Sequence, residues 1–274
     1  MPTIRFLEDP ALLIEGEEKV LVVADLHLGF EREFLSKGIN LPSQTNRILG
    51  KIEDAILKHR PDRLLILGDV KHEVARLPSY EWKELPIFFE KLLALTEVDV
   101  IPGNHDGNLE ALLPRGVVIH KAEGILIKDR GLVYLAHGHA WPSQDALRCH
   151  FLVTAHQHPI IELRDPSGFK VFERVWIEAG WVRRHIAASF LKAQGIKTKR
   201  PLSEFRRRFG FEVKQPKIII MPAFNQLLGG WPVNSQEEGE YINPIFRSIK
   251  TEDSNIYLLD GSYLGKLSTI KSMR

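Results

Sequence analysis

The sequence predicts an α/β fold in which a sandwich of sheets is flanked by helices. The chain has 274 residues and is 44% hydrophobic, which is enough to bury a sizeable core. Short runs rich in Val, Ile and Leu recur, and they are continuously apolar rather than alternating, the pattern of strands covered on both faces. Segments with helical spacing separate the first of these runs, so the sheet is expected to be at least partly parallel.

The first part of the chain alternates predicted strands with predicted helices. The apolar runs cover residues 19–26, 63–70, 98–104, 131–138 and 151–158. One helix is predicted over residues 43–59, with Ser43 as its N-cap. Its apolar residues at helical spacing are Ile48, Ile52, Ala55 and Ile56. A second helix, with a proline inside it, is predicted over residues 80–95.

From about residue 115 the predicted strands become shorter. Residues 116–138 and 159–180 read as antiparallel strands, the second pair with a turn at residues 165–168. Residues 217–225 and 255–271 read as further strands that complete the fold. No domain boundary is convincing. We therefore predict one domain over residues 1–274, with core motifs in 19–160, a basic segment at 183–214 and C-terminal strands in 215–274.

Composition narrows the class of protein. Lys and Arg number 37 against 35 Asp and Glu, a net charge of +2, so any sign of a nucleic-acid partner has to come from a local patch. The single cysteine, Cys149, excludes an internal disulfide or a thiolate metal cluster and favours a reducing compartment. The N-terminus lacks the pattern of a signal peptide, and no apolar stretch approaches the roughly 20 residues of a membrane helix. A soluble, cytoplasmic protein is predicted.

Each of the five predicted strands ends in polar residues. They are Asp25 and His27; Asp69; Asn104, His105 and Asp106; His137 and His139; and His156 and His158. Any one of these clusters by itself reads as an ordinary turn. Together they occupy the strand ends where ligands bind in open α/β sheets, and with His72 they hold seven of the eleven histidines.

These residue types indicate a metal site. Carboxylates, imidazoles and an amide, without thiolates, suit Mn²⁺, Fe or Zn²⁺ better than Ca²⁺. Asp25 and His27 are separated by one residue, so an extended backbone can direct both at one ion, and the same holds for His156 and His158. The ligands are too many for one ion. Two ions that share a bridging carboxylate fit better, with Asp69 as the bridge.

The order DLHLG, GD, GNHD, HGH and HxH resembles the calcineurin-like metallophosphoesterases. The stretches "LGDVKH", "AHGHAWPS" and "HQHP", and also "IIMPAFNQLLGG", are similar to the archaeal branch related to the nuclease subunits SbcD and Mre11. The resemblance implies a metal-dependent phosphoesterase and a four-layer αββα sandwich with a two-metal site at the carboxyl ends of its strands. One departure is Ala155, where the family usually has glycine; a methyl group there could crowd the loop, but both histidines of HxH are present, so the departure is discounted.

The resemblance also implies the ligand sets. One metal would take Asp25, His27 and His158. The other would take Asn104, His137 and His156. Asp69 would bridge them, and a hydroxide between the ions would attack phosphorus in line. The metals are expected to be Mn²⁺, with Fe, Zn²⁺ and Ni²⁺ as alternatives.

Four more residues are expected near the reacting atoms. His105 resembles the histidine that protonates the leaving oxygen, and Asp106 would fix its tautomer. His72 lies where the Mre11-type motif has a histidine near the substrate, and a surface role is equally open. His139 is expected behind the ligands rather than among them, or stacked on the substrate, because His137 is nearer the strand end.

These motifs indicate phosphoester hydrolysis without identifying the phosphoester. The resemblance favours nucleic acid, as does the basic segment 183–214, whose cations could contact phosphates. Its interleaved phenylalanines could stack on bases, or they could lie in the core beneath a solvated helix face. They are Phe190, Phe205, Phe209 and Phe211.

Three functions therefore stay open. The first is a two-metal phosphodiesterase with nuclease activity on DNA or RNA. The second is a small-molecule or cyclic-nucleotide phosphodiesterase, or a monoesterase. The third is a non-catalytic scaffold, ranked last because no residue of the expected metal set is missing. The chain leaves little room for a capping domain or a partner-binding tail, and it has no GxxxxGK[ST] phosphate loop.

Overall fold

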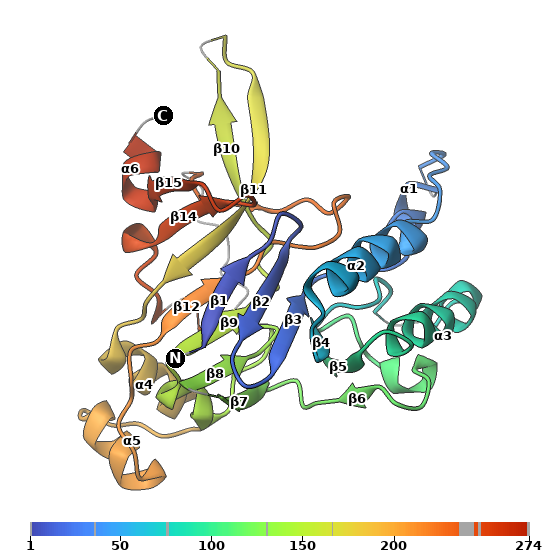
Figure 1. Ribbon diagram of the computed structural model, residues 1–274. Helices are drawn as coiled ribbons and strands as arrows, with labels where there is room; N and C mark the ends of the chain where they lie inside the picture. The colour runs from blue at the N-terminus through green and yellow to red at the C-terminus, as the bar shows by residue number, and fades with distance from the viewer. Residues whose placement is uncertain are drawn as a thin grey trace.

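Two sheets face each other across the middle of the molecule, and helices cover their outer faces (Figure 1). The computed structural model describes residues 2–35, 37–74, 77–129, 131–165, 167–235, 244–245 and 248–272. The helices are α1 (Arg32–Leu35), α2 (Thr45–His59), α3 (Ser79–Leu93), α4 (Arg183–Ala193), α5 (Pro201–Phe209) and α6 (Leu267–Ser272).

The first sheet has six strands in the order β1-β2-β3-β4-β5-β6. They are β1 (Thr3–Phe6), β2 (Ala11–Glu15), β3 (Lys19–Val23), β4 (Arg63–Leu67), β5 (Glu97–Ile101) and β6 (Val118–Ile119). Strands β3 to β6 are parallel, and β1 and β2 form an antiparallel edge. The strands predicted within 19–26, 63–70 and 98–104 are confirmed. The antiparallel prediction for residues 118–119 is wrong, because β6 follows a crossover and joins the edge of this sheet beside β5.

The second sheet has nine strands. They are β7 (Ile125–Asp129), β8 (Gly131–Leu135), β9 (Phe151–Thr154), β10 (Pro159–Arg164), β11 (Lys170–Ala179), β12 (Lys217–Ile220), β13 (Trp231–Pro232), β14 (Asn255–Leu258) and β15 (Tyr263–Lys266). Their main order is β13-β10-β11-β12-β9-β8-β7, with β14 paired to β11 and β15 paired to β14. The predicted antiparallel pairs β7–β8 and β10–β11 are confirmed, whereas β8, β9 and β12 are parallel. The last predicted strand segment is only partly strand, because it ends in α6.

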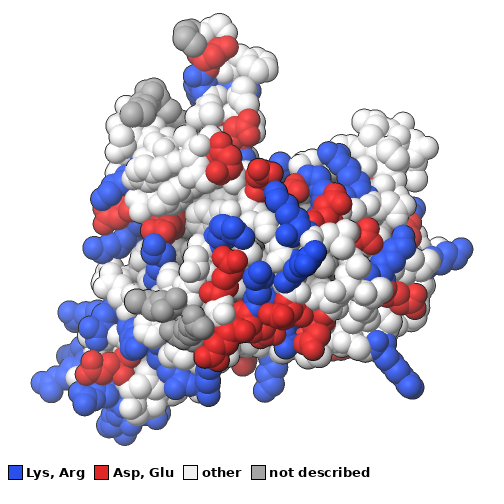
Figure 2. Space-filling view, viewed as in Figure 1, with Lys and Arg blue, Asp and Glu red and all other residues white. Residues whose placement is uncertain are grey.

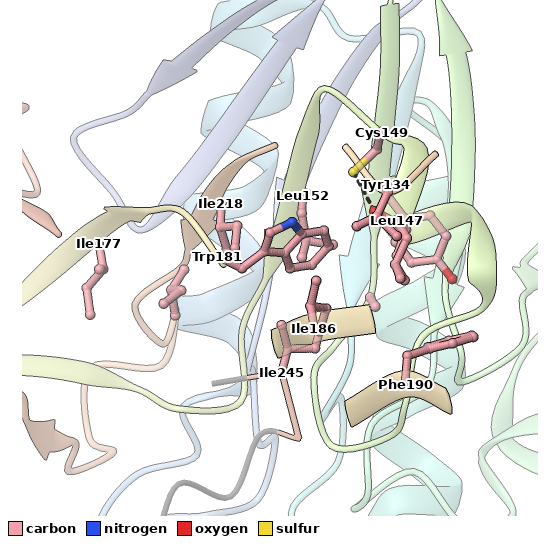
Figure 3. Packing of buried hydrophobic residues seen from close by; sticks show 14 of the residues in the cluster. Tyr134, Leu147, Cys149, Leu152, Ile177, Trp181, Ile186, Phe190, Ile218 and Ile245 are labelled. Carbon is pink, nitrogen blue, oxygen red and sulfur yellow. Dashed lines mark hydrogen bonds between the residues drawn. The ribbon is translucent and has the colours of Figure 1, made fainter. Parts of the chain in front are cut away.

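The core has three parts that correspond to the layers. Apolar residues of both sheets, such as Val22, Leu67 and Val153, pack between them and are fully buried. The outer face of the first sheet packs on α2 and α3. The outer face of the second sheet packs on α4 and α5, where Trp181 lies among buried aliphatic side chains (Figure 3). The predicted four-layer αββα sandwich is confirmed.

Helix α2 begins two residues after the predicted N-cap. Gln44 is the capping residue, and no side chain caps the helix by a hydrogen bond. Ser43 still accepts a bond from the backbone N–H of Thr45 at 3.3 Å. Two carboxylates from elsewhere in the fold bond to the start of this helix: Glu31 Oε1 accepts from Gln44 N at 3.2 Å, and Glu84 Oε2 accepts from the Thr45 hydroxyl at 2.8 Å. Tertiary contacts have therefore shifted the helix start.

The basic segment 183–214 holds α4 and α5. Phe190 and Phe205 are 3% and 0% exposed, and their rings lie 5.9 Å apart in the core. Phe209 and Phe211 pack against the same cluster. These rings do not form a platform for bases, because the outer sheet face needs apolar cover from these helices. Lys and Arg side chains gather over the outside of α4 and α5, at the lower left of Figure 2.

None of the helices in the described part of the chain is both long and apolar enough to cross a membrane.

Candidate metal centre

The five loops that follow β3, β4, β5, β8 and β9 meet at one edge of the sandwich. They meet because β3, β4 and β5 run parallel in one sheet and β8 and β9 run parallel in the other. The fold therefore buries polar side chains here: Asp25 and His137 are 0% exposed, Asp69 is 1% and His27 is 4%. Buried charges of this kind require partners or a cation.

The backbone at these loops is left-handed rather than extended. Positive φ angles between 40° and 69° occur at Asp25, His27, Asp69, His156 and His158. The expectation that an extended backbone directs the side chains is therefore wrong. Each residue other than glycine in this region costs on the order of 1–3 kcal/mol, so the surrounding structure has to hold these loops.

Asp69 lies at the centre of the cluster. Its Oδ2 atom is 3.3 Å from His27 Nε2 and 3.4 Å from His137 Nε2, and its Oδ1 atom accepts a bond from the backbone N–H of His105 at 2.9 Å. Gly103 lies directly against it. Its φ is not positive, so the backbone conformation alone does not demand glycine here. Glycine is required there because a Cβ would overlap the Asp69 carboxylate and backbone.

Asp25, His27 and His158 form one group that could hold a metal ion, with ligand atoms within 4.8 Å of one another. His158 Nε2 lies 3.2 Å from Asp25 Oδ1. Three polar atoms of this group are buried without a hydrogen-bond partner among the described residues. They are Asp25 Oδ1, His27 Nε2 and His158 Nε2.

Asp69, His137 and His156 form a second such group. His137 donates its Nδ1–H to the Leu67 carbonyl at 2.8 Å, which directs Nε2 at Asp69 and His156. His156 Nε2 is buried and unpartnered. The structure thus separates His156 from His158 into different groups. The expectation from their spacing that both face one ion is wrong, because His158 lies with Asp25 and His27, whereas His156 lies with Asp69 and His137.

The two carboxylates determine the protonation of their neighbours. Burial opposes the charge of Asp25, but His158 and His137 outweigh it and hold the pKa of this carboxyl below its usual value. Burial likewise works against the ring charge of His137, yet Asp69 and Asp25 raise the pKa of His137 to about 9. Burial lowers the pKa of His156 to about 4. Protons on the imidazoles therefore balance the carboxylates here, and a divalent cation would compete for the same atoms.

The structure places Asp106 away from His105. Its Oδ1 atom accepts from Val70 N at 2.9 Å, and its Oδ2 atom accepts from Gly103 N at 2.8 Å. The expectation that Asp106 fixes the tautomer of His105 is therefore wrong, because this carboxylate satisfies backbone N–H groups of two neighbouring loops. The backbone carbonyl of His72 fixes the tautomer of His105 instead, because this carbonyl accepts a hydrogen bond from His105 Nδ1 at 2.5 Å.

His72 is part of the cluster rather than a surface residue. Its Nε2 donates to Glu33 Oε1 at 2.8 Å, so its neutral Nδ1 accepts from His27 Nδ1 at 3.2 Å. These hydrogen bonds leave the Nε2 lone pair of His27 facing Asp69. His27, His72 and His105 also have ligand atoms within 4.8 Å of one another. The bonds just described already engage both His72 nitrogens and Nδ1 of His105, which argues against a third metal.

Three predicted residues remain to be placed. Asn104 is exposed on its loop, and no hydrogen bond of its side chain is found within the described ranges. The His139 ring lies 5.3 Å from that of His137, and its buried Nδ1 atom has no partner. Ala155 is 0% exposed and packs between the sheets, so its methyl group fits the core and does not crowd the loop.

Two residues at this centre were missed from the sequence. Glu33 holds His72, and Asn225 contacts the loop that carries Asp25 and His27. No motif marks Glu33, because it follows the strand-end cluster and meets His72 only in the folded chain. Asn225 lies in the noted stretch "IIMPAFNQLLGG", but its residue types do not indicate metal.

The donor set fits divalent cations. The candidate ligands are imidazole nitrogens and carboxylate oxygens, and four of these atoms are buried without partners. Such a set suits Mn²⁺, Fe and Zn²⁺. The two groups share no residue, but they adjoin at Asp69, whose Oδ2 lies 3.3 Å from His27 Nε2 of the first group.

Comparison with known proteins agrees with this geometry. The family model "Calcineurin-like phosphoesterase" matches residues 18–198. The nuclease MPE of Pseudomonas putida superposes with a TM-score of 0.55 at 18% identity, covering 95% of this chain and 96% of that chain. The E. coli phosphoesterase Yfce covers 57% of this chain and 76% of its own at 15% identity, and its TM-score of 0.33 is too low to support an argument.

Replacing Gly103 with alanine should disturb the cluster through Asp69. The new methyl group displaces the Asp69 carboxylate, so we expect Mn²⁺ affinity in calorimetric titration to fall by about 10–100-fold. Gly107→Ala is the matched control in the same loop, because its Cβ would meet only Val74 O at 3.6 Å. Unchanged Mn²⁺ binding by Gly103→Ala would contradict the central role of Asp69.

Proposed function

The chain belongs to the calcineurin-like phosphoesterase family, and from this premise we propose that it is a two-metal phosphodiesterase that cleaves nucleic acid. Membership makes the protein a metal-dependent hydrolase of phosphate esters. The observation that carries the proposal is the convergence of unpartnered, buried donor atoms on both sides of Asp69.

We assign the metal ligands as follows. The first ion is held by Asp25, His27 and His158. The second is held by Asn104, His137 and His156. Asp69 is shared. When bound, the two cations lower the pKa of a water molecule and neutralise charge on the phosphate oxygens. Mn²⁺ is the proposed metal, because the donors combine imidazoles with carboxylates and an amide.

His105 is proposed to protonate the leaving oxygen. Its Nδ1–H is engaged by the His72 carbonyl at 2.5 Å, so Nε2 is the atom that exchanges a proton with substrate. The T-shaped contact with His27, at 4.6 Å between ring centroids, keeps the His105 ring beside the first metal position. His72 holds His27 and His105, and His139 supports His137 from the side, so neither is assigned to the chemical step.

The proposed substrate class rests on the basic surface of residues 183–217. Its cations flank an open pocket of about 770 Å³ lined by Arg148, Arg183, Lys214 and Lys217. Glu204 and Glu212 pair with several of the arginines, whereas Lys197 and Lys199 are exposed and have no ion pair with any described residue. Such a surface can contact the phosphates of a nucleic-acid backbone.

One observation favours a second candidate, a small-molecule phosphodiesterase. The basic pocket is lined by His150, Phe151 and Lys217 at the amino ends of β9 and β12, opposite the metal loops. The length of β9 alone separates the two ends by roughly 13 Å. A compact phosphodiester would occupy the metal centre without contacting the basic surface, whereas a polymer can reach both.

Cys149 is fully buried and reduced, and we propose a cytoplasmic location.

Purified protein with Mn²⁺ should cleave DNA or RNA as well as a generic bis-aryl phosphodiester. The measurement is product formation with single- and double-stranded DNA, RNA and a panel of nucleotides, with and without a chelator. If only the small diester is cleaved, the phosphodiesterase proposal stands and the nuclease proposal is rejected. Absence of bound metal after Mn²⁺ loading would favour a scaffold.

His105→Ala should leave two ions bound and lower the rate of turnover by about 10²–10⁴-fold, because it removes only the proton donor. Asn104→Ala should instead weaken the second ion. Metal content and single-turnover rate are measured on the same samples. Loss of an ion from His105→Ala would show that the two roles have been assigned wrongly.

Charge reversal at Lys197 and Lys199 should weaken nucleic-acid binding and reduce the slope of log K against log salt by about 1 per lost phosphate contact. Hydrolysis of the small diester should not change. Lys58→Glu with Lys91→Glu is the matched control, since both lysines are exposed on the helical layer of the first sheet. If the two double variants weaken nucleic-acid binding equally, the basic surface has no specific role in binding the substrate.

A further inference from the structure

The segment that follows β12, residues 221–231, lies against the first metal position. Its sequence, MPAFNQLLGGW, contributes no residue to the proposed ligand set. It runs beside the loop that carries Asp25 and His27 and ends beside the loop that carries His158. All three proposed ligands of the first ion are therefore on loops that this segment touches.

Asn225 bonds to three consecutive carbonyls of the Asp25–His27 loop. Its backbone N–H donates to Asp25 O at 3.3 Å, and its Nδ2 donates to Leu26 O at 2.9 Å and to His27 O at 3.4 Å. Asp25 and His27 have φ angles of 56° and 40°, in the costly left-handed region. The conformation of this loop therefore depends on hydrogen bonds from other segments. On the opposite side, Gly68 and Asp69 carbonyls accept from Asp25 N and His27 N.

The amide of Asn225 is uniquely suited to this position. The side chain is 1% exposed, and its Oδ1 accepts from Leu227 N at 3.0 Å, which directs Nδ2 toward the loop. Aspartate keeps the acceptor but has no N–H to donate, and alanine has neither.

Arg174 and Gly230 secure the segment. Arg174 Nη2 donates to the carbonyls of Asn225 at 3.3 Å, Gln226 at 2.6 Å and Leu228 at 3.3 Å. Trp231 N donates to His158 O at 2.9 Å, and a Cβ on Gly230 would overlap that same carbonyl oxygen. The segment is thus anchored to β11 and fitted closely to the His158 loop.

The second metal position is supported differently. His137 is held by Leu67 O of β4 through its ring, and its carbonyl accepts from the N–H of Ala155, directly after β9. Within the described ranges, no hydrogen bond joins residues 221–231 to Asp69, His137 or His156.

We propose that Asn225 is a positioning residue for the first metal ion, which it serves by holding the backbone of Asp25 and His27; the assignment rests on the proposed two-metal function. Asn225 does not touch the metal or the substrate. Its loss leaves the second position intact and weakens the first.

The test compares Asn225→Ala with Asn234→Ala. Asn234 is equally buried, at 1% exposure, and makes two backbone hydrogen bonds at 2.9 Å, but to Glu162 rather than to a ligand loop. Calorimetric Mn²⁺ titration of Asn225→Ala should show one ion bound as in the unaltered protein and one bound about 10–100-fold more weakly. Asn234→Ala should bind both ions normally, even if both variants unfold at lower temperature without metal.

Three further measurements complete the test. Asn225→Ala should regain its turnover when Mn²⁺ is raised, and Asn225→Asp should behave like Asn225→Ala. His158→Ala should lose the same ion outright, whereas His156→Ala should lose the other. Equal weakening of both ions, or the same weakening in Asn234→Ala, would overturn the proposal. If the unaltered protein fails to bind two ions, the proposed function itself fails, which is a different result.

Discussion

Two carboxylates buried at the seam between the sheets are the constraint on which this structure depends. Asp25 and Asp69 are 0% and 1% exposed, and Asp69 is close enough to Asp25 to raise the cost of the Asp25 charge. Removing such charges from water is costly unless opposite charge and hydrogen bonds replace the lost solvation. Histidines from both sheets supply the opposite charge, and the same nitrogen and oxygen atoms form a site for divalent cations.

To bring these ligands together, the backbone adopts an unusual conformation at the ligand residues. Five of the proposed ligands have positive φ angles, although none of them is glycine. The sandwich core holds these loops from below, since Ala24, Leu67 and Ala155 are fully buried directly beneath them. Hydrogen bonds between the β3 and β4 loops hold them from the side, as does the segment around Asn225. Conformational cost is thus concentrated at the site and offset by the rest of the fold.

The two ends of the second sheet have different characters. The metal loops lie at the carboxyl ends of β8 and β9, and the basic pocket lies at the amino ends of β9 and β12. Family membership accounts for the first end, because phosphoester hydrolysis takes place at such metal sites. The charges at the second end lie outside that chemistry, and the proposed nucleic-acid substrate would give them a role.

The sequence by itself determined the five strands that carry the site and the residue types at their ends. Continuous apolar runs predict covered strands, and the polar residues after them predict a metal cluster, because both depend on local residue types. The tertiary structure decided how those residues face one another. His156 and His158 separate into two groups, Asp106 turns to backbone N–H groups, and Gly103 is needed for space beside Asp69. These outcomes depend on left-handed φ angles and on loops from distant parts of the chain, which residue spacing does not encode.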